Sequence, residues 1–470
     1  MTTRSQQYQM ARISLLLFTV FLLTVGVVMQ YSCDIGLDLS FQDLTLGSIL
    51  HSNPSRQVLW IVMGGTAAFI VSRLDYEKTI VHFAPTFYLI AVALLSYLAL
   101  ASLAKHHIHL PFIGDTKGGY RWIELPGPLR MLKIQPSEFA KLATTICICM
   151  FFARNRTLLA PEKPFALARV LWDRWIIRTI GNEEWRKELA RIWKEYWIGF
   201  ILPGLIMAVP CILILLGRSL SMTILTFMQS YLLSMCAGVR RFYLIVAAVL
   251  ISYLTWCGYD YGSNSPITLR DGSVYQNKTS GEVSSFNCIR YNPAFTAERL
   301  ERLTSWRHPE VVQQEGGMQL WYSQLALGSG GLTGVGLGNS RLKRDYLPEK
   351  HNDFVISVLG EEFGYIGVCM VLFFYAGLVG SAFWIAILAR RNQLLMLSAT
   401  GFGLLIGCHA FINIGVASGF LPTTGITAPF LSYGGSSMIV SLVTIGLLIS
   451  VSTTAERQEL NAAIEIREGE

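Results

Sequence analysis

The hydrophobic positions of this chain form long uninterrupted runs that are separated by polar connections. A helix needs about 20 apolar residues to cross the hydrocarbon core of a bilayer. Runs close to that length occupy residues 13–29, 58–71, 83–104, 136–153, 197–216, 222–238, 242–257, 354–389, 394–416 and 430–451. The pattern predicts an all-α polytopic membrane protein with about ten transmembrane helices. The run at 354–389 exceeds one crossing, so we expect it to include tilted or interfacial turns.

The polar connections predict the orientation of these helices. Arg4 and Arg12 precede the first run, and alternate connections carry most of the remaining basic residues. The positive-inside rule then places both termini in the cytoplasm. Two connections on the opposite side are long and polar: 106–135 and the large extracytoplasmic loop 258–353, between helices 7 and 8. The first of these carries basic residues on the side where they are usually scarce, which indicates an anionic ligand; they are Lys117, Arg121, Arg130 and Lys133.

We expect residues 1–470 to form a single membrane domain with one addition. Segment 154–196 mixes tryptophan and leucine with basic and acidic residues at roughly helical spacing. Such a segment is typical of a cytoplasmic amphipathic insertion that lies on the membrane surface. Packing against the underside of the bundle is an equally good interpretation, and the sequence leaves both open.

Composition excludes several classes of protein. The 470 residues are 52% hydrophobic and 15% charged, which is too apolar for a soluble protein. The formal net charge of +7 is spread over short connections, so it does not indicate nucleic-acid binding. The nine cysteines include no Cys-x-x-Cys pair, and nothing indicates a zinc site or an organic cofactor. Cys33 and Cys288 both fall in predicted outer loops, and whether they pair stays open.

Asp353 is the strongest candidate for a catalytic group. It is the last polar residue before the run at 354, so it lies at the boundary between water and membrane. A carboxylate there can act as a general base toward a sugar hydroxyl. It can also cap the following helix, because Asp is a favoured N-cap residue, and the two roles are compatible. Glu361 and Glu362 lie roughly 12 to 13 Å further along the helix, so we interpret them as helix-packing or cavity-lining groups.

A second polar group opens the run at 136. Ser137, Glu138 and Lys141 are spaced three and four residues apart, on one face of a helix. Ionisable groups inside a membrane span almost always face the bundle interior or a water-filled cavity. The alternative is a buried ion pair that only fixes helix register. Just before this group, Arg121 can bind a phosphate bidentately, and Trp122 can stack on a sugar or belong to an interfacial aromatic belt.

Two glycine-rich segments lie on the same predicted side as Asp353. Residues 328–338 lack the Lys-Ser/Thr pair of a nucleotide-binding loop, and we expect a flexible re-entrant turn that leads into the basic segment containing Arg344 and His351. Residues 419–437 contain two prolines and several glycines, so this backbone must be buried or line a cavity. His409 and Asn413 could reach that cavity, although interhelical hydrogen bonds are the default for both.

Seven motifs together resemble the SEDS family (shape, elongation, division and sporulation), polytopic peptidoglycan glycosyltransferases that include RodA and FtsW. They are Gly-Tyr-Arg-Trp-Ile at 119–123, Gln-Pro-Ser-Glu-Phe-Ala-Lys-Leu at 135–142, Gly-Gly-Leu-Thr-Gly-Val-Gly-Leu-Gly at 330–338, Leu-Pro-Glu-Lys-His-Asn-Asp-Phe at 347–354, Gly-Glu-Glu-Phe-Gly at 360–364, Leu-Pro-Thr-Thr-Gly at 421–425 and Ser-Tyr-Gly-Gly-Ser-Ser at 432–437. They follow the order of the family over nearly the whole chain. The chain is more similar to the division type, FtsW.

The resemblance implies polymerisation of lipid II on the outer face of the bacterial cytoplasmic (inner) membrane, for septal wall synthesis. Asp353 matches the essential aspartate of the family, and a divalent cation, Mg²⁺ or Mn²⁺, would bind at Asp353. The implied substrate-binding residues are Arg121, Trp122, Ser137, Glu138, Lys141, Arg344, His351, Ser432 and Ser436. The implied partners are undecaprenyl-linked glycan, membrane lipids, a class B penicillin-binding protein and other divisome proteins.

The chain departs from the family pattern in three places. Ser219 stands where the family has an aspartate, and the segments 154–196 and 259–292 are longer than usual. Two other functions therefore stay open beside the glycosyltransferase. A lipid II flippase would also use intramembrane charges and broken helices, and a non-catalytic scaffold would only recruit a transpeptidase.

Overall fold

The computed structural model of the chain describes residues 4–34, 53–104, 121–124, 133–155, 201–239 and 317–468, with scattered positions at 197, 245, 248–249, 252–253, 256, 267–268, 274–275, 302 and 305–307. Within these residues, seven helices are long and apolar enough to cross a membrane. They are α1 Arg4–Asp34, α3 Asn53–Arg73, α4 His82–Ala104 with the preceding π-helix η1 Tyr76–Val81, α5 Pro136–Arg154, α16 Val355–Leu388, α17 Gln393–Ala417 and α18 Gly435–Glu468.

Shorter elements complete the described structure. Two more apolar helices are α9 Leu202–Leu216 and α10 Leu220–Cys236; two polar-loop helices are α14 Met318–Ser329 and α15 Leu342–Asp345. Two antiparallel two-residue strand pairs are β1 Ile123–Glu124 with β2 Lys133–Ile134, and β3 Ile267–Thr268 with β4 Val274–Tyr275.

The prediction of a polytopic all-α membrane protein is confirmed. The seven long helices and α9 and α10 coincide with predicted runs. The run at 242–257, the insertion 154–196 and the large loop 258–353 lie wholly or partly outside the described residues, as do Lys117, Arg130 and Cys288. The pairing of Cys288 therefore stays untested, whereas Cys33 is a free, buried thiol.

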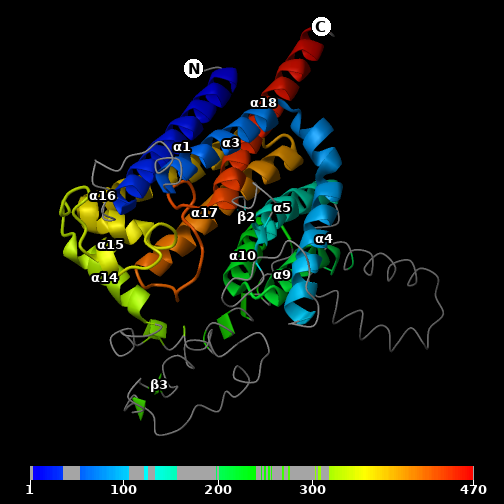
Figure 1. Cartoon of the computed structure of the whole chain (residues 1–470). Helices are drawn as coiled ribbons and strands as arrows, with labels where there is room; N and C mark the ends of the chain where they lie inside the picture. Colours follow the sequence, from blue (N-terminus) through cyan, green and yellow to red (C-terminus); the bar gives the residue numbers. More distant parts are fainter. Residues whose placement is uncertain are drawn as a thin grey trace.

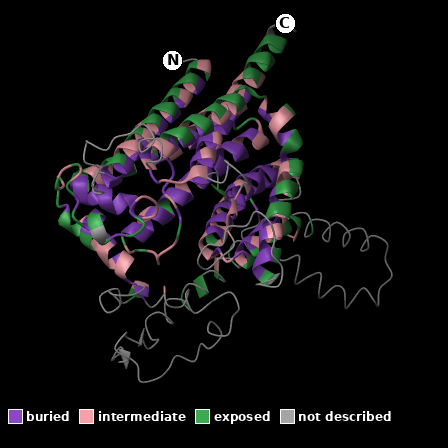
Figure 2. Ribbon diagram, viewed as in Figure 1, coloured by how far each residue is buried: buried purple, intermediate pink, exposed green. Residues whose placement is uncertain are grey.

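Three helices form the centre of the bundle. The most apolar windows of α5, α17 and α18 are 83%, 78% and 78% buried, whereas that of α3 is 17% buried. Figure 2 shows the same division, with buried residues along the central helices and exposed ones along the outer helices. Lipid tails are as apolar as leucine, so burying an apolar side chain between helices gains no hydrophobic free energy. Small and polar residues are therefore enriched where membrane helices pack together. The polar candidates on α5 and α17 consequently lie in the interior.

The ends of the helices bring the candidate segments together. Both termini lie at one end of the bundle (Figure 1). The last turn of α1 and the first turns of α5, α16 and α18 lie at the opposite end, because each of these helices runs the length of the bundle. The turn 346–354, which precedes α16, and the segment 418–434, which joins α17 to α18, therefore meet at the end opposite the termini.

The longest predicted run contains a kink at Gly364, where φ is 66°. The glycine-rich loop 330–338 pairs with both sides of this kink: Val335 N–H donates to Glu361 O (3.0 Å), and Tyr365 N–H donates to Gly331 O (2.9 Å). A Cβ at Gly334 would lie 2.1 Å from Glu362 O. The glycines therefore permit close backbone approach, and the expectation of a flexible turn is wrong because the backbone hydrogen bonds fix this loop against α16.

We predict that Gly364→Ala destabilises the protein. A left-handed residue with a Cβ costs about 1–3 kcal/mol, and here the added atom would also lie 2.4 Å from Gly334 N. The thermal unfolding midpoint of the detergent-purified protein measures the effect. Gly328→Ala is the matched control, because Gly328 is in α14 with nothing within 4 Å of its added Cβ. Equal midpoints for both variants would contradict the prediction.

Candidate active site

Asp353 lies in the turn immediately before α16. Its backbone carbonyl accepts a hydrogen bond from Asn413 Nδ2 (3.0 Å), which also donates to Ile426 O (2.7 Å). A Cβ on Gly425 would lie 3.7 Å from Asp353 Oδ2, so the carboxyl group faces the broken segment. The N-cap residue of α16 is Phe354, with no side-chain cap. The capping role is therefore wrong for Asp353, and its carboxylate remains available to a ligand.

The surroundings of Asp353 adjust its acidity. Burial in protein raises the pKa of the Asp353 carboxyl to about 7, and the negative charge of Glu349 adds to the increase, whereas the positive charges of Arg302 and Arg121 oppose it. The side chain is nevertheless only half-buried. A carboxyl group that is open to solvent on one side and titrates near neutral pH can accept a proton from a substrate.

Arg302 is a site residue that the sequence analysis missed. It lies close enough for its charge to lower the pKa of Asp353, although it precedes Asp353 by about fifty residues of chain. Nearby, Trp306 Nε1 donates to Gly419 O (2.9 Å), which attaches the helical residues 305–307 to the broken segment. The available signal was the run of arginines 299, 302 and 307 among leucines and a tryptophan at helical spacing.

Glu138 and Lys141 form the predicted ion pair in the centre of the bundle. Lys141 Nζ lies 2.9 Å from Glu138 Oε2, and both side chains are buried. Within the described residues, Glu138 Oε1 and His409 Nε2 have no hydrogen-bond partner. Lys141 lies within electrostatic reach of His409. Buried polar atoms without partners are costly in a membrane interior, so this group is suited to contact a polar ligand.

Arg121 lies near both Asp353 and the polar group at the start of α5. Its Nη2 donates to Arg218 O (2.8 Å), and it lines a small cavity of about 20 Å³ together with Ser137 and Ser219. Its charge also acts on Asp353. Ser219 therefore lies among the predicted site residues, although it replaces the aspartate of the family pattern. Trp122 is half-buried beside Arg121.

Two of the predicted substrate-binding residues make hydrogen bonds within the protein, and a third is exposed. Ser432 Oγ accepts from Ala428 N–H (2.7 Å) and donates to Asn352 O. Ser436 Oγ accepts from Gln135 N–H (3.1 Å) and donates to Lys133 O (3.0 Å). Each serine hydroxyl donates its proton to a backbone carbonyl. Ser432 therefore links the broken segment to the turn before α16, and Ser436 links the start of α18 to the strand β2. Arg344 is exposed on α15.

The structure gives ion-pair partners to two further residues that the sequence singled out. Lys133 Nζ forms an ion pair with Glu124 Oε1 (2.9 Å) across β1 and β2, so its charge is already paired. His351 Nε2 lies 3.5 Å from Asp34 Oδ1 at the end of α1. Burial lowers the pKa of His351, against the opposing charge of Asp34. A neutral imidazole at pH 7 can still bind a sugar hydroxyl.

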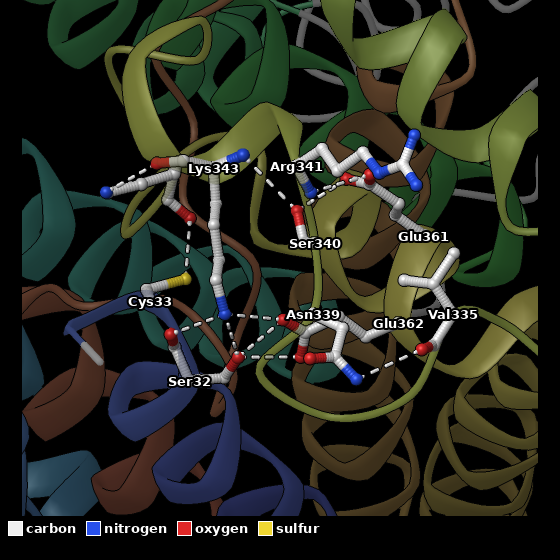
Figure 3. Close-up of polar contacts among 10 residues, drawn as sticks. Ser32, Cys33, Val335, Asn339, Ser340, Arg341, Lys343, Glu361 and Glu362 are labelled. Carbon is white, nitrogen blue, oxygen red and sulfur yellow. Dashed lines mark hydrogen bonds and ion pairs between the residues drawn. The ribbon is translucent and has the colours of Figure 1, made fainter. Parts of the chain in front are cut away.

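Glu361 and Glu362 are buried packing groups, as predicted. Glu361 Oε2 accepts from Ser340 Oγ (2.5 Å) and its Oε1 from Arg341 N–H (2.9 Å). Glu362 Oε1 lies 2.7 Å from Lys343 Nζ in a fully buried ion pair (Figure 3). Lys343 therefore cannot serve as a free cation for a substrate.

A larger cavity lies at the other end of the bundle. It has a volume of about 690 Å³ and is lined by Tyr8, Glu77, Arg154, Asn392 and Glu459, among others. No predicted site residue lines it. We place the candidate active site at Asp353, away from this cavity, because the charges of Arg121, Arg302 and Glu349 act on Asp353, and Arg121 and Ser137 line a cavity together.

Comparison with known proteins identifies the family. The family model described as cell cycle protein, which covers FtsW, RodA and SpoVE, matches residues 13–457. A protein of Coxiella burnetii named probable peptidoglycan glycosyltransferase FtsW is 30% identical over 443 residues, which are 93% of this chain and 95% of that protein. A protein of the same name from Geobacter sp. (strain M18) is 29% identical over 446 residues, again 93% and 95% of the two chains.

Solved structures share the fold. One, described as "Structural coordination of polymerization and crosslinking by a peptidoglycan synthase complex", matches with a TM-score of 0.62 at 20% identity and covers 94% of this chain and 97% of that chain. The crystal structure of Thermus thermophilus rod shape determining protein RodA matches with a TM-score of 0.53 at 20% identity, covering 93% and 95%. The chain therefore belongs to the FtsW, RodA and SpoVE family of cell cycle proteins.

Proposed function

We propose that this protein is a peptidoglycan glycosyltransferase that polymerises lipid II, with Asp353 as the general base. One observation carries the proposal: a half-buried carboxyl group with a pKa of about 7 lies in the turn before an apolar helix long enough to span a membrane, within reach of the charges of Arg121 and Arg302. The relatives named probable peptidoglycan glycosyltransferase FtsW support the same reaction.

In this reaction the 4-hydroxyl of one disaccharide attacks the anomeric carbon of a lipid-diphosphate-linked glycan. Asp353 accepts the hydroxyl proton as the new C–O bond forms. The bond between the anomeric carbon and the diphosphate oxygen breaks, and undecaprenyl diphosphate leaves with its electron pair. The ionised form of Asp353 is needed to accept this proton.

The leaving diphosphate requires positive charge. Arg121 is the cation that the geometry favours, because it lies between Asp353 and the buried group of α5. Lys141 is the second, since its only described charged partner is Glu138 (2.9 Å). A guanidinium can bind phosphate oxygens bidentately, whereas an ammonium acts as a point charge. Trp122 and His351 are the candidates for contacts with the sugar.

A divalent cation, Mg²⁺ or Mn²⁺, fits this site only together with substrate. Within the described residues, no group of three or more His, Cys, Asp or Glu side chains could hold a metal ion. Mg²⁺ is commonly bound by one or two carboxylates and substrate phosphates. Asp353 would supply one carboxylate, and Glu349, whose charge acts on Asp353, would supply the second. A bound cation would neutralise diphosphate charge. We expect EDTA to slow polymerisation and excess Mg²⁺ to restore it; an unchanged rate would contradict this role.

The proposal includes a location and a partner. A multi-pass membrane protein of this family whose termini share one end would have both termini in the cytoplasm and Asp353 on the outer face of the inner membrane. A structure with the same fold is described as a peptidoglycan synthase complex that coordinates polymerization and crosslinking, and our proposed partner for this chain is accordingly a class B penicillin-binding protein. The relatives named FtsW and the family of cell cycle proteins support a role in cell division.

The test uses purified full-length protein in detergent or liposomes with lipid II, alone and with a class B penicillin-binding protein. Glycan polymer on a gel is the expected product. Translocation of labelled lipid II without polymer would support a flippase, and neither activity with a stable transpeptidase complex would support a scaffold. Either of the last two outcomes would overturn the proposal.

We predict that polymerisation depends on pH through Asp353. Because the carboxyl has a pKa of about 7 and must be ionised to act as a base, the rate should fall about tenfold per pH unit below pH 7 and level off above it. Glu349→Gln removes a negative charge that raises this pKa, so the profile should shift to lower pH. A flat rate of polymerisation between pH 5 and pH 7 would contradict the assignment.

A further inference from the structure

We propose that the buried ion pair of Lys343 and Glu362, with the end of α1, positions the turn that carries Asp353. The inference rests on the proposed function of Asp353. Lys343 belongs to α15, Glu362 precedes the Gly364 kink, and Ser32 is in the last turn of α1. Figure 3 shows their side chains converging from these three elements. We call Gln30, Ser32, Cys33 and Asp34 the α1 platform.

The ammonium group of Lys343 is held in one geometry. An ammonium has three N–H donors, and Lys343 Nζ has three oxygens in reach: Ser32 O (2.9 Å), Ser32 Oγ (2.9 Å) and Glu362 Oε1 (2.7 Å). Ser32 O is among the last carbonyls of α1, which lack partners within the helix. Lys343 therefore caps α1 with a positive charge, which the helix dipole favours, while Ser32 Oγ contacts both oxygens of Glu362 (2.6 Å).

The same elements fix the chain just before Asp353. Lys350 Nζ donates to Lys343 O (2.6 Å), and Cys33 Sγ donates to Lys350 O (3.8 Å). Gln30 Nε2 donates to both His351 O (3.0 Å) and Leu431 O (3.2 Å). Residues 350 and 351 are thus held by the α1 platform and by Lys343. Asp353 follows two residues later, so its position depends on contacts with a helix more than 300 residues earlier in the chain.

These residues are positioning residues, because none of them contacts the site proposed for the reacting atoms. A displacement of about 1 Å at a catalytic group can reduce a rate 10²-fold. The platform therefore acts mainly on the rate of the chemical step, because Arg121 and Lys141, which bind the diphosphate, lie outside it. His351, a candidate sugar contact, is held by the platform, so KM should also change, but less than kcat. The expected signature is a fall in kcat that is larger than any rise in KM.

The test replaces both charges at once. Lys343→Met with Glu362→Gln keeps the side-chain volumes and leaves no unpaired buried charge, so folding should be preserved. We expect kcat for lipid II polymerisation to fall about 10- to 100-fold, with a smaller change in KM and a thermal unfolding midpoint close to wild type. Ser32→Ala, which removes one hydroxyl and keeps the ion pair, should lower kcat several-fold and covers the case in which the double variant does not fold.

Glu361→Gln is the matched control, at the neighbouring position. A glutamine there can accept from Arg341 N–H and donate to Ser340 Oγ, so both contacts of Glu361 persist. Its kcat should remain close to wild type. Wild-type kcat in a folded double variant or in Ser32→Ala would overturn the inference, and so would a rise in KM as large as the fall in kcat. If the wild-type protein makes no polymer, the proposed function fails instead.

Discussion

Asp353→Asn is expected to abolish polymerisation while leaving the protein folded. General-base catalysis contributes about 10²–10⁴-fold to a rate, and the amide of asparagine cannot accept the proton. The substitution should not unfold the protein, because the site already disfavours the charged carboxylate, as the pKa of about 7 indicates. The measurement is the initial rate of lipid II polymerisation by purified protein, with the unfolding midpoint recorded for the same samples.

Asp75→Asn is the matched control for this substitution. Asp75 caps η1 at the end of the bundle that carries the termini, and its carboxylate accepts from Glu77 N–H (3.1 Å) and Lys78 N–H (3.0 Å). Asparagine caps about as well as aspartate, so its polymerisation rate should stay close to wild type. Polymer formation at the wild-type rate by Asp353→Asn would disprove the proposed role of Asp353.

Lys141→Met is expected to cause the largest loss of stability. It leaves Glu138 buried without its counter-charge, since Glu138 Oε2 has Lys141 Nζ at 2.9 Å and Oε1 has no hydrogen-bond partner within the described residues. Removing one member of a buried ion pair typically costs about 3–5 kcal/mol. The free energy of unfolding in detergent, or the shift of the unfolding midpoint, measures the loss.

The double variant Glu138→Gln with Lys141→Met separates the two roles of this pair. Replacing both members of a buried pair by neutral residues is often neutral for stability, so the unfolding midpoint should return toward wild type. Polymerisation should remain impaired, because the positive charge for the diphosphate is absent. Recovery of both stability and activity would contradict a role in diphosphate binding. The pair would then only fix the register of the helices, which is the alternative that the sequence left open.

The sequence was most informative where the physics is local. The hydrophobic runs predicted the helices α1, α3, α4, α5, α16, α17 and α18, because crossing a bilayer demands a continuous apolar stretch. Glycine clusters predicted irregular backbone, but the composition did not show which segment that backbone packs against. Loop 330–338 pairs with the kink at Gly364, and a kink of that kind has no signature in hydrophobic periodicity.

The sequence alone therefore determined the class of protein, the family resemblance and Asp353 as the candidate base, since each depends on residues close together in the chain. Only the tertiary structure decided which groups surround Asp353: Arg302 and Arg121, whose charges act on it, and the α1 platform, which contacts the turn before it. These contacts join segments that are about fifty to more than 300 residues apart in the chain. The geometry of these contacts depends on how whole helices pack against one another. It therefore cannot be predicted from the residues of any one short segment.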